Sequence, residues 1–394
     1  MRDALAVASW LNGVMVLLAM GISAVPVMAP AIAADLGLST KLVGTYTALL
    51  WGASVLTSIL VGRLVARFGA LRVLQLTLLM CATGLMLGGV GPALFLALTA
   101  VLIGLGQGAE TPAGSALLVR ITRPPDRPFI LSLKQTGGQI GGMLAGLLFP
   151  LLLPWIGWRG SLLALVPVIA VVTLFLEGPR RKYEPRSQHR RAAYAFTFLD
   201  ALKLFGRDGA LLRLSIVCMT YVAVHMALIA FLVSFLVEEG GLSLPQAGAL
   251  MAIAQFGGLV GRVLWGILSG RFMSAVSLLV LIGAGMLGCA AVLGLFGDRL
   301  PVAALALVCL GFGMTAGGWA GIHIAETARL APPDAITQVT SAMFVIGALG
   351  LVLGPVAFSA LAAVTSFGTA YVGAAGCALA GMLALLGAPK ARYG

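Results

Sequence analysis

Long apolar runs, separated by short polar stretches, make up most of the chain. A membrane-spanning helix needs roughly 20 apolar residues, and we find one run after another of about that length. We place these runs at roughly 8–33, 43–66, 70–91, 93–119, 131–153, 159–177, 210–237, 243–268, 274–296, 300–326, 336–361 and 366–388. The pattern predicts an all-α membrane protein with 12 transmembrane helices.

One polar stretch is much longer than the others and divides the runs six and six. It extends from Glu177 to Asp208 and is rich in arginine. Its charge favours an aqueous loop that also touches anionic lipid. We therefore expect an N-terminal six-helix bundle over 1–177, a cytoplasmic linker over 178–208 and a C-terminal six-helix bundle over 209–394.

The composition supports lipid as the environment of the chain. The protein has 394 residues, of which 60% are hydrophobic and 10% charged, against about 25% charged in a soluble domain. The net charge of +12 does not indicate nucleic-acid binding, because the basic residues lie in short loops and form no face interleaved with stacking aromatics. No phosphate-binding glycine loop or nucleophile constellation is present, so we predict neither an enzyme nor a cofactor or metal.

The basic residues also predict the orientation of the chain. With both termini in the cytoplasm, only Lys41, Arg159 and Arg299 of the 25 Lys and Arg residues fall on the outer side. Lys and Arg are concentrated in cytoplasmic loops of membrane proteins. We expect a multi-pass protein of the cell inner or plasma membrane, with cytoplasmic termini and a monomeric state.

An internal repeat links the two halves. Gly37-Leu38-Ser39 precedes the second run, and Gly241-Leu242-Ser243 precedes the eighth at an offset of 204 (241 − 37). Gly62 and Gly266, at the ends of the same two runs, have the same offset of 204 (266 − 62). Two parallel repeats imply a pseudo-two-fold axis along the membrane normal.

The fourth and tenth runs extend the repeat at a slightly different offset. Gly104-Leu105-Gly106 and Gly311-Phe312-Gly313 match at 207 (311 − 104). The architecture that follows has a central cavity between two halves and moves solute by alternating access of the rocker-switch type.

A loop signature carries a family resemblance. The segment after the second run is similar to G-x-L-x-D-R-x-G, with Gly62, Leu64, Arg67 and Gly69 matching and Ala66 standing where the Asp should be. On these residues the chain resembles the major facilitator superfamily over its whole length. The resemblance implies a gating role on the cytoplasmic side for Gly62, Arg67, Gly69 and, in the second half, Arg271. Loss of the Asp puts the cytoplasmic latch of that family in doubt.

Two further stretches resemble anion transporters of the same superfamily. Ser132–Gln139 is similar to a segment of cyanate/nitroimidazole-type transporters, and Gly261–Gly266 resembles the Gly-Arg-Pro-x-x-Gly segment of oxalate/formate and monocarboxylate transporters. In the latter the Arg faces the cavity and pairs with a carboxylate. This resemblance implies the same role for Arg262.

Arg262 is also unusual on physical grounds. An Arg within a span costs about 2.5–3.5 kcal/mol on insertion scales. Gln255 lies near the middle of this run, and Arg262 lies two turns further along it. It either grips an anionic group with its planar fork or snorkels and pairs with a structural partner. The repeat places Ser58 opposite Arg262 (262 − 204), so the charge is specific to the second half.

Two charged residues of the first half complete the ionic set. Lys134 is either a second cationic ligand or the interfacial start of its helix, and Gln135 and Gln139 at i, i+4 suit one hydrated face. Glu110 is either a proton carrier, since burial raises the pKa of a carboxyl, or the ion-pair partner of Lys134 or Arg120.

Uncharged candidates are Gln107, Gln255 and His225. Together these residues favour a secondary active or facilitative transporter of a small, carboxylate-like anion, with protons as a further partner. Drug or metabolite efflux by proton antiport is the alternative, and a transporter-like sensor is a third hypothesis. The sequence leaves the substrate, the direction and the ion coupling open.

Overall fold

The computed structural model describes residues 2–123, 126–183, 205, 208–269, 272–331 and 336–386. Within these ranges the chain is helical apart from short connections and one isolated β-bridge between Ser269 and Met273. The predicted all-α class is confirmed.

The helices of the first half are α1 (Arg2–Leu36), η1 (Thr40–Leu42), α2 (Val43–Phe68), α3 (Ala70–Val90), α4 (Leu94–Ile121), α5 (Arg127–Gln135), α6 (Gly137–Phe175) and α7 (Glu177–Tyr183). Those of the second half are α9 (Gly209–Glu238), α10 (Leu244–Leu268), α11 (Ala275–Phe296), α12 (Val302–Gly318), α13 (Ala320–Leu330), α14 (Ile336–Val364) and α15 (Phe367–Leu386).

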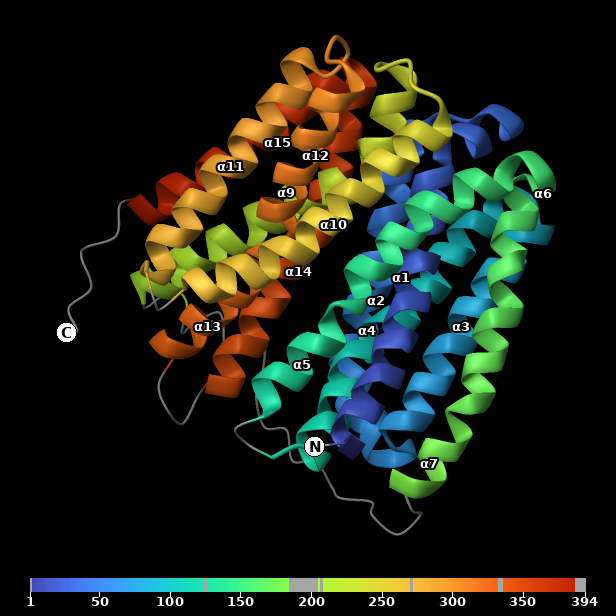
Figure 1. The fold of residues 1–394 in the computed structure, drawn as a ribbon, viewed down its shortest axis with the longest axis vertical. Coiled ribbons are helices and arrows are strands. Elements are labelled where there is room, and N and C mark those ends of the chain that lie inside the picture. Colours follow the sequence, from blue (N-terminus) through green and yellow to red (C-terminus); the bar gives the residue numbers. More distant parts are fainter. Residues whose placement is uncertain are drawn as a thin grey trace. The chain divides into compact units, whose positions relative to one another are not determined.

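Eleven helical segments of the described chain are long and apolar enough to span a membrane, and one of them crosses twice. That segment, Ile130–Tyr183, has 54 residues, or roughly 80 Å of helix, against a hydrocarbon core of about 30 Å. Gly157 interrupts it with φ 65° and ψ 177°, a conformation that glycine adopts readily. Figure 1 shows α6 folding back on itself, so that α5 and α7 lie at the same end. The described helices therefore supply the 12 predicted crossings.

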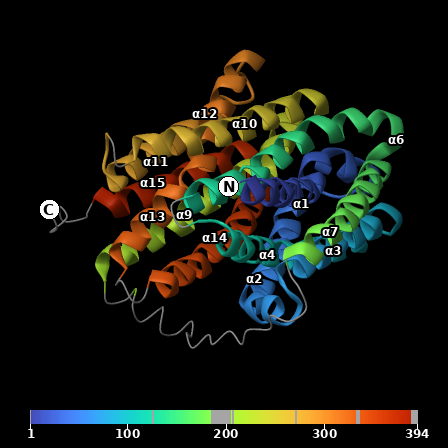
Figure 2. The same cartoon turned by 60° about the horizontal axis from the view of Figure 1, so that its bottom comes forward.

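The chain forms two compact units. The first comprises Met1–Ser39 and Tyr46–Ala193, and the second comprises Thr40–Thr45 and Tyr194–Gly394. In the first, α1 packs on α6 and α3 packs on α4; in the second, α10 packs on α12 and α15 packs on both α9 and α11. Figure 2 shows α11, α15 and α9 following one another across the second unit.

Part of the predicted linker over 178–208 is helical. Helix α7 extends as far as Tyr183, and α9 begins at Gly209. The carboxylate of Asp208 accepts a hydrogen bond of 2.8 Å from the backbone N–H of Ala210, which is the N-cap arrangement that starts a helix. Most of the remaining linker lies outside the described residues.

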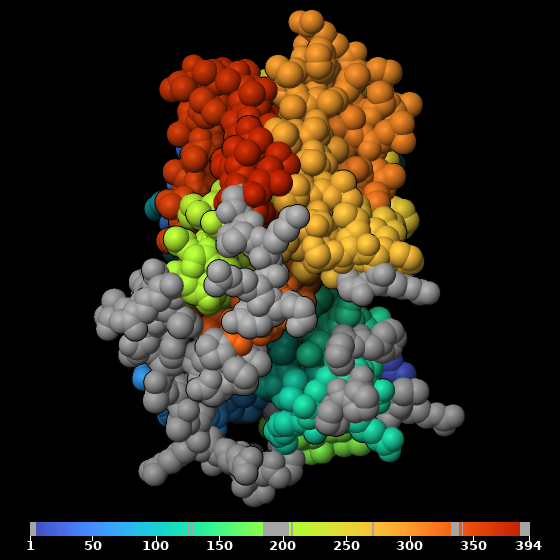
Figure 3. Space-filling model, turned by 90° about the vertical axis from the view of Figure 1, so that its left-hand side faces the viewer, coloured from blue at the N-terminus to red at the C-terminus, as the bar shows by residue number. Residues whose placement is uncertain are grey.

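The outer face of the second unit is apolar. Figure 3 shows α11 in gold beside α15 in red on this face. Leu295 and Phe296 of α11 and Leu383 of α15 are more than half exposed. Helices that are apolar on both their inner and outer faces are typical of membrane spans.

The repeat is visible in how the helices pack. A Cβ added to Gly104 in α4 would overlap the carbonyl of Leu50 in α2, and one added to Gly313 in α12 would overlap the carbonyl of Ala254 in α10. Leu50 and Ala254 are 204 positions apart (254 − 50). The predicted offset between the second and eighth helices is thus confirmed by equivalent backbone contacts.

The same contacts correct the offset of the fourth and tenth helices. Gly104 and Gly313 are 209 positions apart (313 − 104), and so are Gly108 and Gly317 (317 − 108), which pack on α2 and α10 in the same way. The predicted pairing of Gly104 with Gly311 at 207 is wrong. A Cβ on Gly311 would meet only the Cys289 sulfur, at 3.4 Å, so Gly311 does not face the neighbouring backbone.

Close helix packing recurs between the first and fifth helices of each repeat. Gly141 of α6 lies against the backbone of Val16 in α1, and Gly350 of α14 lies against the backbone of Met219 in α9. The offsets are 203 (219 − 16) and 209 (350 − 141). Small residues allow membrane helices to approach this closely.

Candidate functional site

The first unit contains a completely buried ion pair. Lys134 Nζ of α5 lies 2.7 Å from Glu110 Oε1 of α4, and neither side chain has any exposed surface. The stem of Lys134 passes close to Gly114, whose added Cβ would lie 3.0 Å from its Cε. Of the two partners proposed for Glu110, the structure places Lys134 against it. The two opposite charges compensate each other in a medium where a single charge is very costly.

Asn12 supports this pair from α1. Its amide nitrogen donates hydrogen bonds to the carbonyl oxygens of Leu133 at 2.9 Å and Lys134 at 3.2 Å, and to Thr136 Oγ1 at 3.0 Å. The predicted run over 131–153 is divided here, because α5 ends at Gln135 and α6 begins at Gly137. Asn12 thus donates to carbonyls at the end of α5, where intrahelical donors are lacking.

The amides predicted to line a cavity lie near this break. Gln135 is the last residue of α5 and Gln139 belongs to α6, on the two sides of Thr136. Gln139 is buried, and Gln135 is half-buried. Gln107 is half-buried on α4, one turn before Glu110.

Arg262 is held at the end of α12. Its Nε donates a hydrogen bond of 3.0 Å to the carbonyl oxygen of Gly317. Gly317 lies in the last turn of α12, and the helical run is interrupted at Trp319 before α13 begins. Carbonyl groups in the last turn of a helix lack intrahelical donors, and a cation is favourable there.

Two further predicted residues accompany Arg262 in the second unit. His225 of α9 is half-buried, and α9 packs on α10, the helix of Arg262. Gln255 is buried on α10, seven residues before Arg262, and therefore on the same helix face and about two turns away. This set offers N–H donors and a positive charge, which suits an anion.

Aromatic side chains fix the break between α12 and α13. Trp319 meets Tyr221 edge-on at 5.6 Å and His323 at 5.3 Å between ring centroids. Trp265 Nε1 donates to the carbonyl of Met314 at 2.7 Å. These contacts involve residues of α12 and α13 on both sides of Gly317 in the sequence.

The loop signature lies at the junction of α2 and α3. Gly69 precedes α3 with φ 87°, a region that disfavours other residues, which explains this glycine. Arg67 is exposed, and its guanidinium lies 5.2 Å from the ring centre of Phe68. Gly62 is half-buried near the end of α2. Arg271 lies outside the described residues.

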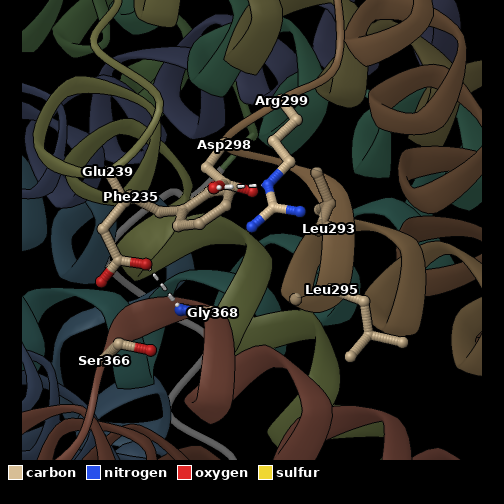
Figure 4. Close-up of a pocket in the computed structure, with 9 residues that line it drawn as sticks. Phe235, Glu239, Leu293, Leu295, Asp298, Arg299, Ser366 and Gly368 are labelled. Atoms are coloured by element: carbon tan, nitrogen blue, oxygen red, sulfur yellow. Dashed lines mark hydrogen bonds and ion pairs between the residues drawn. The ribbon is translucent and has the colours of Figure 1, made fainter.

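A cavity of about 390 Å³ lies elsewhere in the second unit. It is formed where α9, α11 and α15 have their ends, and Figure 4 shows Glu239 pointing toward the start of α15. The Glu239 carboxylate accepts from the N–H groups of Phe367 at 2.5 Å and Gly368 at 2.9 Å. Glu239 therefore caps α15. None of the residues lining this cavity is a predicted site residue.

Sequence reasoning missed Asn12 and Ser58 as parts of these clusters. Asn12 is detectable as an amide inside an apolar run. Ser58 carries a signal too, because the repeat sets it opposite Arg262. The signal for the Trp319 break is the glycine pair Gly317-Gly318 directly before it, since glycine is unfavourable in a helix interior. Among the described residues, no three His, Cys, Asp or Glu side chains are grouped closely enough to hold a metal ion.

Comparison with known families decides the identity of this architecture. The family model described as the Major Facilitator Superfamily matches residues 11–355 of the chain. The chain belongs to the Major Facilitator Superfamily. Its helices, its repeat and its loop signature are therefore those of a membrane transporter of this superfamily.

Individual relatives are also transporters by their names. The chain is 28% identical over 353 residues to a "Putative metabolite transport protein" of Haemophilus influenzae, covering 87% of this chain and 85% of that protein. The nucleoside transporter NupG superposes with a TM-score of 0.79 at 16% identity, covering 96% of this chain and 99% of its own.

A second solved structure has the same fold. An inward-facing, unoccupied bacterial homolog of the human lysosomal transporter Spinster superposes with a TM-score of 0.71 at 18% identity, covering 98% of this chain and 95% of that one. At these identities the likeness to both solved structures concerns the fold of this superfamily member.

Proposed function

We propose that this Major Facilitator Superfamily member transports a small, carboxylate-like anion by rocker-switch alternating access. The observation that carries the proposal is Arg262, a permanent cation in a membrane-spanning helix. Its Nε donates a hydrogen bond to the neutral carbonyl of Gly317. A charged residue within a span usually marks a substrate or ion pathway. His225 of α9 and Gln255 of α10 are further polar groups of this unit that suit an anionic solute.

The chemistry of the guanidinium supports a carboxylate. Its five donors lie in a planar fork that matches the two oxygens of a carboxylate. Its Nε donates to the carbonyl oxygen of Gly317. The name of the Haemophilus influenzae relative supports a metabolite as the solute.

The ion pair of the first unit supports a role for protons. Protonation of Glu110 would remove the negative charge that now compensates Lys134 at 2.7 Å. Lys134 would then need another anion, and the solute is one. We therefore assign Glu110 as the proton carrier and Lys134 as a second ligand, so that a proton and an anion enter together.

Uptake into proteoliposomes tests the proposal. Radiolabelled formate, acetate and oxalate are offered to wild-type protein and to Arg262→Ala, with Gly266→Ala as the matched control on the same helix. A Cβ at Gly266 meets no atom within 4 Å, so this control is expected to transport normally.

We expect Arg262→Ala to lower transport of the preferred anion by at least about tenfold, since charge-assisted hydrogen bonds contribute about 1.5–3 kcal/mol. Unchanged uptake of every transported anion by Arg262→Ala would overturn the proposal. For coupling, wild-type uptake should rise with an inward proton gradient, and Glu110→Gln should abolish that rise.

A further inference from the structure

Two hydrogen bonds occupy equivalent places in the two repeats. Ser58 Oγ of α2 donates to the carbonyl of Gly108 in α4 at 3.0 Å, and Arg262 Nε of α10 donates to the carbonyl of Gly317 in α12 at 3.0 Å. The donors are 204 positions apart (262 − 58) and the acceptors 209 (317 − 108). These are the offsets that the helix packing gives, so the repeat accounts for the Nε contact of Arg262.

Both carbonyl groups belong to weak points of their helices. The regular donor for Gly108 would be the N–H of residue 112, and Pro112 has none. Gly317 lies just before the interruption at Trp319 that separates α12 from α13. In each repeat, therefore, the second helix supplies a side-chain donor to a carbonyl that the fourth helix leaves without its regular partner.

The donors differ in charge. The hydroxyl of Ser58 is neutral, and it also bonds to the carbonyl of Ser54 in its own helix at 2.9 Å. The guanidinium of Arg262 is cationic and, under the proposed function, is also the ligand of the transported anion. Only in the second unit does one side chain serve both the helix carbonyl and the solute.

We propose that Arg262 is a positioning residue as well as a ligand, coupling anion binding to the break between α12 and α13. An anion that binds the guanidinium changes the hydrogen bond between Arg262 and the Gly317 carbonyl. The orientation of α13 relative to α12 then changes. Ser58 makes the equivalent hydrogen bond in the first unit, and its neutral hydroxyl does not bind the solute. The inference rests on the proposed function, because it requires an anion at Arg262.

Hydrogen exchange of the full-length protein in detergent tests this coupling. Peptides covering 314–323 and the equivalent 105–114 are followed with and without formate, acetate or oxalate, and with the neutral amides of these acids. Wild type, Arg262→Ala and Arg262→Ser are compared. The Ser variant carries the residue that the first unit uses for the same contact.

In wild type we expect the bound anion to change exchange over 314–323 by about threefold or more. Arg262→Ala should raise exchange over 314–323 without anion by about 2- to 10-fold, the effect of one lost hydrogen bond. Arg262→Ser should keep exchange near the wild-type rate and lose the response to anions.

The outcomes separate this inference from the proposed function. A carboxylate that raises the melting temperature of the wild type but leaves exchange over 314–323 unchanged contradicts the coupling alone. If none of the three carboxylates raises the melting temperature, the proposed function is wrong as well. Equally fast exchange in Arg262→Ser and Arg262→Ala contradicts the equivalence with Ser58.

Discussion

The two repeats share their packing but differ in where they place charge. The first unit buries Glu110 against Lys134. At the equivalent positions the second unit has Trp319 and Met343, both at an offset of 209 (319 − 110 and 343 − 134). Conversely, the second unit has Arg262 where the first has Ser58.

The residues that pack the helices together thus differ from the residues that recognise a charge. The glycine contacts recur at constant offsets because each helix pair must approach closely in both units. The charged residues do not recur, since no packing requirement calls for them. Asn12 and Ser215 illustrate the difference, because they are equivalent (215 − 12 = 203), yet Asn12 supports a charged pair and Ser215 Oγ lies 3.6 Å from the Met343 sulfur.

The largest effect is expected from breaking the buried pair. Lys134→Met introduces the residue that the second unit has, and Glu110→Ala removes the other partner. Each leaves one buried charge uncompensated, which costs about 3–5 kcal/mol. We expect each single change to lower the melting temperature in detergent by roughly 10 °C, as measured by intrinsic fluorescence.

The double variant Lys134→Met with Glu110→Leu is the control for this prediction. It removes both charges, so at least half of the lost stability should return. Two single variants with near wild-type melting temperatures would show that the pair is not desolvated.

A smaller, symmetric effect is expected at the glycines. Gly104→Ala and Gly313→Ala both place a methyl group on the carbonyl of a neighbouring helix, and overpacking costs about 1–3 kcal/mol. Gly52→Ala in α2, where a Cβ meets nothing within 4 Å, is the matched control and should be neutral or slightly stabilising. A large loss in one unit and none in the other would contradict the packing equivalence.

The smallest effect concerns the hydroxyl of Ser58. Ser58→Ala should cost about 0.5–1.5 kcal/mol, because the Gly108 carbonyl loses its donor. In a Pro112→Ala background the backbone N–H of residue 112 can take over, so the same change should cost less. Equal costs in both backgrounds, measured as a double-mutant cycle of unfolding, would show that Pro112 does not create the need for Ser58.

Much of the fold is predictable from the sequence. The apolar run length gives the number of helices, because the bilayer fixes the length of each span. The offset of 204 follows from the loops around Gly62 and Gly266. The offset of 209 could not be obtained this way, since Gly311 and Gly313 look alike in sequence and only the neighbouring backbone distinguishes them.

The candidate site is less predictable. A charge within an apolar run identifies Arg262, Lys134 and Glu110 as exceptional, because a buried charge needs a partner or a task. The sequence does not choose among partners that lie on different helices, so the pairing of Glu110 with Lys134 required the structure. The contact of Arg262 with Gly317 depends on the interruption at Trp319. The pair Gly317-Gly318 does not predict it, since the pair Gly257-Gly258 lies inside the uninterrupted α10.

Ligand-induced stabilisation tests the central claim, that the charge unique to the second unit recognises the solute. Purified wild type, Arg262→Ser and Ser58→Ala are melted with formate, acetate and oxalate and with their neutral amides. Binding to the folded state raises the melting temperature by mass action. We predict a shift for at least one carboxylate over its amide in wild type and Ser58→Ala, and none in Arg262→Ser. An undiminished carboxylate shift in Arg262→Ser would contradict the account.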